Sequence, residues 1–243
     1  MSLGPAMAFS LEQETNLRER WKNVILLYLQ VKPYVIASEK AVASLSDGLD
    51  GGGRERLSVT AINELRNALD HAARAQAVWQ GWLPVPEKAG LDPFDYCSTN
   101  IDKAKGHVYR AGYDALDIVT TARSEEIRKI VDGLRMSTLV TVFHNYAADI
   151  RQPINQAIKL CDDAKASKDV ESDKMGQQYY VMYKDALSLL ENVLNRLTTH
   201  LPELTSVDTE KRHEYKRQRN IAIVLAVLGI IATIVIGIMY GTR

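Results

Sequence analysis

The stretch from Tyr179 to Leu204 reads YYVMYKDALSLLENVLNRLTTHLPEL, and its apolar side chains return every three or four positions. These side chains are Tyr179, Tyr183, Ala186, Leu190, Val193, Leu197, Leu201 and Leu204. Steps of four and three place one apolar stripe along an α-helix, as in a helical bundle or a coiled-coil seam. The stretch therefore predicts a long helix over residues 173–204 that packs against other helices.

Similar spacing covers most of the chain, whereas the alternating pattern of strands is scarce. Four earlier helices are expected at about 10–45, 58–82, 94 into the 120s, and 137–166. Ser10 and Gln13 form a capping box at the start of the first, and Pro33 is expected to kink or split it. Pro153 is expected to disturb the fourth helix in the same way. The fold class is thus all-α, with a bundle of about five helices.

Two of these helices have well-defined apolar stripes, and two connections separate the first three helices. The second helix is expected to turn inward Ile62, Leu65, Leu69, Ala72, Ala75 and Trp79, and the third Ile101, Ala104, Val108, Ala111, Ala115 and Ile118. Three adjacent glycines predict a loop over residues 47–53, and three prolines predict a stiff connection over residues 83–93.

Residues 221–240 form an uncharged apolar run. A helix of 20 residues is about as long as a bilayer core is thick, so the run predicts one C-terminal transmembrane helix. We expect three regions: a cytoplasmic helical bundle domain at 1–205, a basic juxtamembrane segment at 206–220 and the membrane span at 221–240. Residues 1–10 lack the basic cluster and apolar core of a signal peptide.

The charges around this run predict its orientation. Five basic residues precede it, and Arg243 alone follows it; the five are Lys211, Arg212, Lys216, Arg217 and Arg219. The positive-inside rule then predicts a single-pass protein of the cell membrane with its N-terminal domain in the cytoplasm. The same residues could instead serve to bind anionic headgroups, and the two interpretations are compatible.

Small residues recur along one side of the apolar run: Ala222, Ala226, Gly229, Thr233 and Gly237. Small side chains let two membrane helices approach closely, so this stripe predicts helix–helix packing and a homo-oligomer in the lipid bilayer. The alternative is that glycine and alanine are simply common in membrane helices.

Charge and cysteine content argue against several classes of function. The chain carries 30 basic and 30 acidic residues, and the part before residue 206 holds 24 basic and 27 acidic ones. A slightly acidic body argues against broad DNA binding. The two cysteines, Cys97 and Cys161, predict no disulfide framework, and no metal-type spacing or cofactor motif is present, so no metal or cofactor is expected.

The stretch Asn63-Glu-Leu-Arg-Asn-Ala-Leu-Asp-His71 contains an arginine, a polar residue and a histidine five positions after the arginine. It resembles the signature of the HEPN superfamily, small all-helical domains that often act as metal-independent ribonucleases. The resemblance implies that His71 is a general acid or base, that Arg66 holds the scissile phosphate across a dimer, and that Asn67 orients the pair. The alternative is an ordinary surface, with Arg66, Asp70 and Arg74 at salt-bridge spacing.

A second polar cluster is expected on one face of the third helix: Lys103, His107, Arg110, Asp114 and Asp117. If the second and third helices pack antiparallel, this face and the 66–71 stretch would meet across a groove. Two histidines and two arginines there would bind phosphate or cleave a phosphodiester. The alternative is that Arg110 and Asp114 form only a solvated ion pair.

Two functions follow from these patterns. The first is a membrane-anchored helical effector or interaction protein that oligomerises at the cytoplasmic face, in bacterial antiviral defence, and binds a protein partner. The second is a membrane-tethered, HEPN-like ribonuclease whose partner is RNA.

Overall fold

The computed structural model describes the backbone of residues 9–46, 55–166 and 173–241, and the side chains of residues 9–43, 59–166 and 177–231. The described residues form seven α-helices and no strand, which confirms the all-α helical bundle. The helices are α1 (Leu11–Ser46), α2 (Glu55–Trp79), α3 (Pro93–Asp132), α4 (Met136–Val142), α5 (Gln152–Ala166), α6 (Asp173–Thr199) and α7 (Leu201–Gly241). A short 3₁₀ turn precedes α3 (Glu87–Ala89), and a π-helical turn precedes α5 (Ala147–Arg151).

Local sequence signals explain where α1 and α3 begin. The backbone N–H of Gln13 donates to Ser10 Oγ at 3.2 Å, and the N–H of Ser10 donates to Gln13 Oε1 at 3.0 Å, so the predicted capping box is confirmed. At α3, Asp92 accepts from the N–H of Asp95 at 2.9 Å, and Pro93 occupies the first helical position. α1 continues as one element through Pro33. The loop expected at 47–53 lies outside the described residues.

Two predicted helices are each divided in the structure. The helix expected at 137–166 separates into α4 and α5, because the backbone of Phe143 is extended and ends α4. Pro153 then lies in the first turn of α5, where proline is tolerated. The helix expected at 173–204 ends at Thr199, because Pro202 has no N–H to donate to the preceding turn and its ring clashes with the carbonyl four residues earlier.

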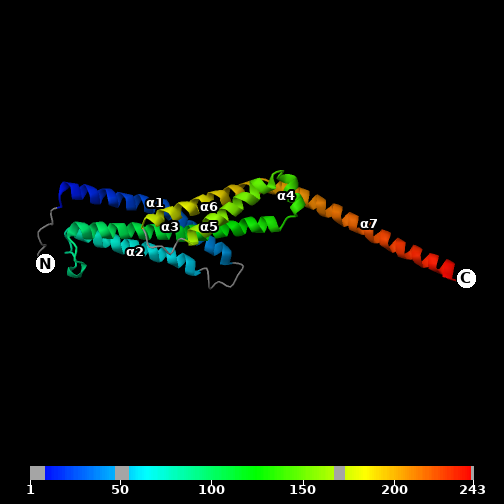
Figure 1. The fold of residues 1–243 in the computed structure, drawn as a ribbon, viewed down its shortest axis with the longest axis horizontal. Helices are drawn as coiled ribbons and strands as arrows, with labels where there is room; N and C mark the ends of the chain where they lie inside the picture. The colour runs from blue at the N-terminus through cyan, green and yellow to red at the C-terminus, as the bar shows by residue number, and fades with distance from the viewer. Residues whose placement is uncertain (1–8, 47–54, 167–172, 242–243) are drawn as a thin grey trace.

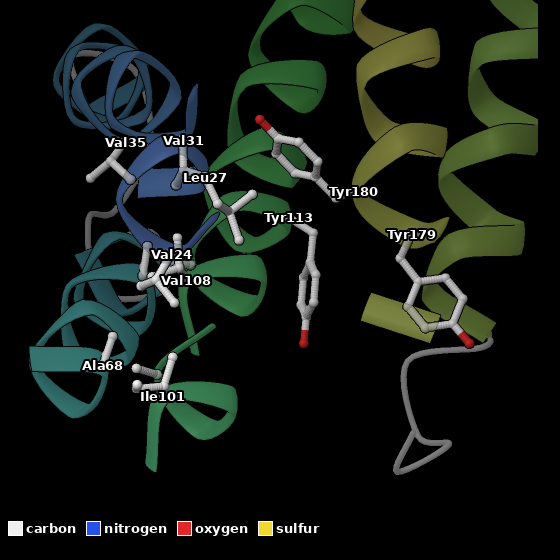
Figure 2. Close-up of a cluster of buried hydrophobic side chains, with 14 of the residues drawn as sticks. Val24, Leu27, Val31, Val35, Ala68, Ile101, Val108, Tyr113, Tyr179 and Tyr180 are labelled. Atoms are coloured by element: carbon white, nitrogen blue, oxygen red, sulfur yellow. The ribbon is translucent and has the colours of Figure 1, made fainter. Parts of the chain in front are cut away.

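α3 is the central element: α1, α2 and α6 pack along it, α5 packs against α6, and α7 extends away from the bundle (Figure 1). Its first two thirds share a core with α1, α2 and the start of α6; Figure 2 shows Val24, Ala68 and Val108 of three different helices lying together. Its last turns share a second core with α4, α5 and the end of α6, built on Leu139, Ile150 and Leu190. The predicted inward stripes of the third helix and, apart from Leu201, of residues 179–204 are buried as expected.

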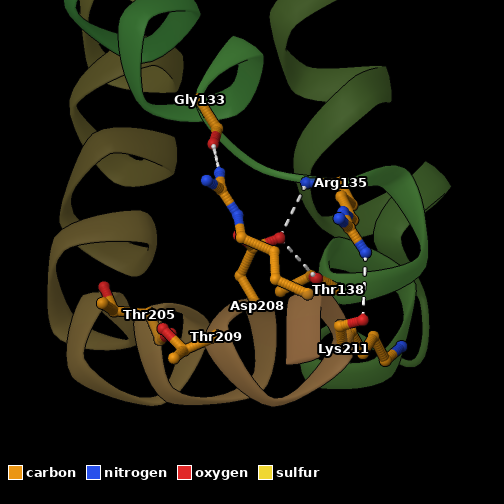
Figure 3. Close-up of polar contacts among 8 residues, drawn as sticks. Gly133, Arg135, Thr138, Thr205, Asp208, Thr209 and Lys211 are labelled. Carbon is orange, nitrogen blue, oxygen red and sulfur yellow. Dashed lines mark hydrogen bonds and ion pairs between the residues drawn. The ribbon is translucent and has the colours of Figure 1, made fainter. Parts of the chain in front are cut away.

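The start of α7 is held to α4 by a group of polar contacts that we call the α4–α7 junction (Figure 3). Asp208 accepts from the N–H of Arg135 at 3.3 Å, from Thr138 Oγ1 at 3.1 Å, and from Arg212 Nε at 2.6 Å. Lys211 Nζ donates to Ser137 O at 2.7 Å. Asp208 thus caps α4, whose N-terminal residue Arg135 has no side-chain cap of its own.

The structure corrects the expected membrane span. Among the residues that the structure describes, no helix is long and apolar enough to cross a membrane. The first half of α7 carries charged residues as far as Arg219. The predicted transmembrane helix at 221–240, and with it the single-pass cell-membrane location, is therefore contradicted. Thr233 and Gly237 lie outside the residues with described side chains.

Candidate functional site

The candidate site forms where α2 and α3 pack antiparallel, the arrangement on which the expected groove depended. The pairing is visible in contacts that run in opposite directions along the two helices, from Glu64 with Arg110 to Cys97 with Ala75. The interface is lined with small residues that allow close approach; the buried ones are Ala61, Ala68 and Ala75 on α2 and Ala104, Ala111 and Ala115 on α3. Longer polar side chains project at the edge of this interface. We call Glu64, His71, Asn100, His107 and Arg110 the histidine cluster.

Glu64 connects two of the predicted residues. Its Oε2 lies 2.7 Å from His107 Nδ1 and 2.8 Å from Arg110 Nε. Burial by itself would raise the pKa of Glu64, but hydrogen bonds from His107 and Arg110 outweigh it and lower that pKa below the ordinary value. Glu64 is therefore an ionised acceptor at neutral pH.

The ionised carboxylate fixes the tautomer of His107. Since a carboxylate can only accept, Nδ1 of His107 carries a hydrogen and donates to Glu64. Arg110 Nη2 also lies 2.9 Å from this Nδ1, but two donors cannot bond, so the contact only reflects their shared acceptor. His107 thus presents Nε2 as its second, acceptor nitrogen.

Asn100 fixes the tautomer of His71 in the same way. Its amide nitrogen donates to the carbonyl of Tyr96 at 2.9 Å, which turns Oδ1 toward His71. Oδ1 lies 2.8 Å from His71 Nδ1, so this nitrogen is the donor and Nε2 again has the lone pair. Asn100 is buried, so water does not compete for its amide and the side chain keeps this orientation.

The two imidazole rings are stacked on one another. Their centroids lie 5.3 Å apart and their planes differ by 17°. Within the described part of the chain, no hydrogen bond engages Nε2 of either ring. The His107 side chain keeps 16% of its surface exposed and Arg110 keeps 39%, so the cluster is reached from solvent. In these tautomers the Nε2 atoms of both rings can accept a proton, and either ring becomes a proton donor once it is protonated.

The other predicted residues are distributed around this cluster. Asn67 is half-buried one turn before His71, and Lys103 is exposed one turn before His107. Asp114 is half-buried further along α3. Arg66 lies on the opposite side of α2, where it lines a groove beside α1, and no polar contact among the described residues joins it to His71. The role that the resemblance implies for Arg66 stays a prediction.

The ordinary-surface interpretation holds for one part of the motif. Asp70 and Arg74 form an exposed ion pair at 2.7 Å, one turn apart on α2. Sequence reasoning missed Glu64 and Asn100, although each lies seven positions before a cluster histidine and therefore on the same helix face. In the regions that the structure describes, no three His, Cys, Asp or Glu side chains group as metal ligands would.

Comparison of the chain with protein-family models, with curated proteins and with solved structures finds no match. The resemblance of residues 66–71 to the HEPN signature therefore rests on the sequence pattern, and functional inference rests on the geometry of the cluster.

Proposed function

We propose that the protein is a metal-independent ribonuclease in which His71 and His107 transfer the protons. The observation that carries the proposal is the stacked pair of imidazoles. In each ring Nδ1 is held by a hydrogen bond, which leaves Nε2 to exchange a proton with a substrate. The HEPN-like pattern around His71 supports the same reaction class. RNA is the substrate class because its 2′-hydroxyl supplies an internal nucleophile.

The reaction needs one base and one acid. One imidazole Nε2 removes the proton of the 2′-hydroxyl, whose oxygen attacks the adjacent phosphorus and forms a new P–O bond. The other, as imidazolium, gives a proton to the 5′-oxygen as its bond to phosphorus breaks. The products are a 2′,3′-cyclic phosphate and a 5′-hydroxyl, so atoms and charges balance without a further reactant.

The neighbours of each histidine suggest how the roles divide. His107 faces the carboxylate of Glu64, which stabilises the positive charge of an acid form. His71 faces the neutral amide of Asn100, which suits the uncharged base. Lys103 and the outer nitrogens of Arg110 add positive charge for the phosphate, and a guanidinium can hold two phosphate oxygens at once.

A cleavage assay on the full chain tests the proposal. A fluorescent single-stranded RNA should be cut with EDTA present, and His71→Ala or His107→Ala should lower the rate by about 10²-fold or more. His144→Ala, at an exposed histidine outside the cluster, is the matched control and should cleave at the wild-type rate. An RNA with 2′-O-methyl groups should resist cleavage.

Two results would contradict the proposal. The first is cleavage that survives both histidine substitutions in protein whose helical content is unchanged. The second is equal cleavage of the 2′-O-methyl substrate, because that molecule lacks the internal nucleophile. Homo-oligomerisation and an effector role in antiviral defence stay predictions from the sequence.

A further inference from the structure

α1 and α2 both lie along α3, and between them runs an open groove of about 530 Å³. Its lining comes from three helices, with Val108 of α3 buried at its base. The lining residues are Trp21, Val24, Ile25, Tyr28, Ile62, Leu65, Arg66, Ala68, Leu69, Ala72 and Val108. All of them except Arg66 are apolar or aromatic.

The walls of the groove expose large apolar side chains to water. Leu69 is 69% exposed, Ile62 47% and Ile25 46%. Covering the remaining exposed surface of these side chains would remove apolar area from water, which favours binding. Such contiguous apolar surface on a folded protein commonly marks an interaction site.

We propose that this groove binds an amphipathic α-helix of a partner protein. α1 and α2 form two helical walls over α3, which is the arrangement that a further helix completes in a bundle. The walls extend over Trp21–Tyr28 and Ile62–Ala72, a length of roughly 15 Å or three helical turns. A helix of that length places apolar anchors at i, i+3 or i+4, and i+7 into such a groove.

The single charge in the lining specifies the chemistry of the partner. Within the described part of the chain no polar contact holds the Arg66 guanidinium, so an acidic residue beside the apolar anchors of the incoming helix would pair with it. Trp21, Tyr28 and Arg66 are also the residue types that dominate binding energy at interfaces. The chain's own α7 leaves from the opposite end of the bundle and points away from the groove (Figure 1).

Selection from a displayed library of helical peptides of about 15 residues tests this proposal on the full chain. Peptides enriched on the wild-type protein should carry apolar residues at helical spacing and an acidic residue beside them. Measured by fluorescence anisotropy, Leu69→Glu should weaken binding of an enriched peptide by about tenfold or more, because it removes an apolar contact and places a charge within the apolar interface. Val140→Glu, at an exposed apolar residue on α4 outside the groove, should leave affinity unchanged.

A charge exchange makes the test specific to Arg66. Arg66→Glu should weaken binding, and replacing the peptide's acidic residue by lysine should restore it. His71→Ala should bind the peptide normally, so failure of the ribonuclease proposal and failure of this one are distinguishable. No enrichment, equal binding to Leu69→Glu, or occupation of the groove by a second copy, seen as dimers that Leu69→Glu dissociates, would each overturn the proposal.

Discussion

In the proposed ribonuclease reaction Asn100 is a positioning residue, because it contacts His71 and has no part in the proton transfers. Its amide is fixed by the carbonyl of Tyr96 and in turn holds His71 Nδ1. Without it, His71 could rotate or take the other tautomer. We expect Asn100→Ala to lower kcat for RNA cleavage by about tenfold or more, a part of the ~10²–10⁴-fold that a positioned acid or base contributes. KM should change little, because substrate binding depends on other residues.

The Asn100 prediction is checked by steady-state kinetics together with the ¹⁵N chemical shifts of His71, which report its tautomer. Asn195→Ala, at an exposed asparagine on α6, serves as the control. An unchanged kcat with an altered tautomer would show that the orientation of His71 has no part in the reaction.

Glu64 links the cluster to the stability of the fold through its lowered pKa. Burial opposes this lowering, and the hydrogen bonds from His107 and Arg110 overcome it. Because the folded-state pKa lies below the ordinary value of 4.5, Glu64 stabilises the fold above that pH, and this contribution is lost as the pH falls through the folded-state value. We therefore expect the Tm of the wild type to fall more steeply than that of Glu64→Gln as the pH is lowered below 4.5.

Thermal unfolding followed by circular dichroism across this pH range measures the difference. Glu87→Gln, at an exposed carboxylate before α3, should follow the wild-type curve. Parallel curves for the wild type and Glu64→Gln would mean that the Glu64 contacts add nothing to stability.

At the scale of elements, Gly112 allows three helices to meet. A Cβ at this position of α3 would lie 2.9 Å from Val31 Cγ2 on α1 and 2.9 Å from Tyr180 Cε2 on α6. Both neighbours are buried, so neither can move aside easily. Gly112→Ala should lower the free energy of unfolding by about 1–3 kcal/mol through overpacking.

Urea denaturation of Gly112→Ala gives this value. Gly229→Ala on α7 is the matched control, because its Cβ would meet nothing within 4 Å and alanine favours helix. A neutral or stabilising effect of Gly112→Ala would show that α1 and α6 have room to separate.

The helices also show which features of the fold could be predicted from the sequence. Helix type and most inward stripes follow from periodicity, but the stripe predicted for α2 is only partly confirmed. Ala75 is buried, whereas Ile62 and Leu69 are exposed, and Ala61 and Ala68, which lie outside the predicted stripe, are buried. Both faces have helical spacing, and periodicity cannot choose between large side chains that line a groove and small ones that let α3 approach. That choice depends on which helices are neighbours, which is a tertiary property.

The sequence likewise predicted some residues of the candidate site and missed others. His71, His107 and Arg110 could be placed together from their spacing and an assumed antiparallel pair of helices. Glu64 and Asn100 were missed because an isolated acidic or amide residue on a helix is usually solvated, and only the distances to the histidines distinguish these two. Arg66 points away from the cluster because five residues of helix place it about 140° around the axis of α2 from His71.

At the scale of the whole molecule, the two cores lie one after the other along α3, and α7 extends the bundle beyond the second. α7 passes through residues 205 and 220 without a break. The charged segment between these positions contributes to the second half of the bundle, because Asp208, Lys211 and Arg212 all contact α4 or the turn before it. Arg135 also lies over the ring of Tyr215 at 5.4 Å.

Two truncations test whether this segment stabilises the bundle. A chain ending at residue 220 keeps the α4–α7 junction, and a chain ending at residue 205 loses it and leaves the first turn of α4 without its cap. Removing the acceptor of buried donors lowers the free energy of unfolding by about 1–3 kcal/mol. For a domain of this size that loss lowers the Tm by roughly 2–10 °C. We expect the shorter chain to melt lower than the longer one by that amount, and Asp208→Ala in the longer chain to reproduce most of the difference. Glu210→Ala, at an exposed carboxylate on the same helix, should melt with the longer chain. Equal melting of the two truncated chains would show that α4 stays folded without α7 and that the second core alone holds this end of the bundle.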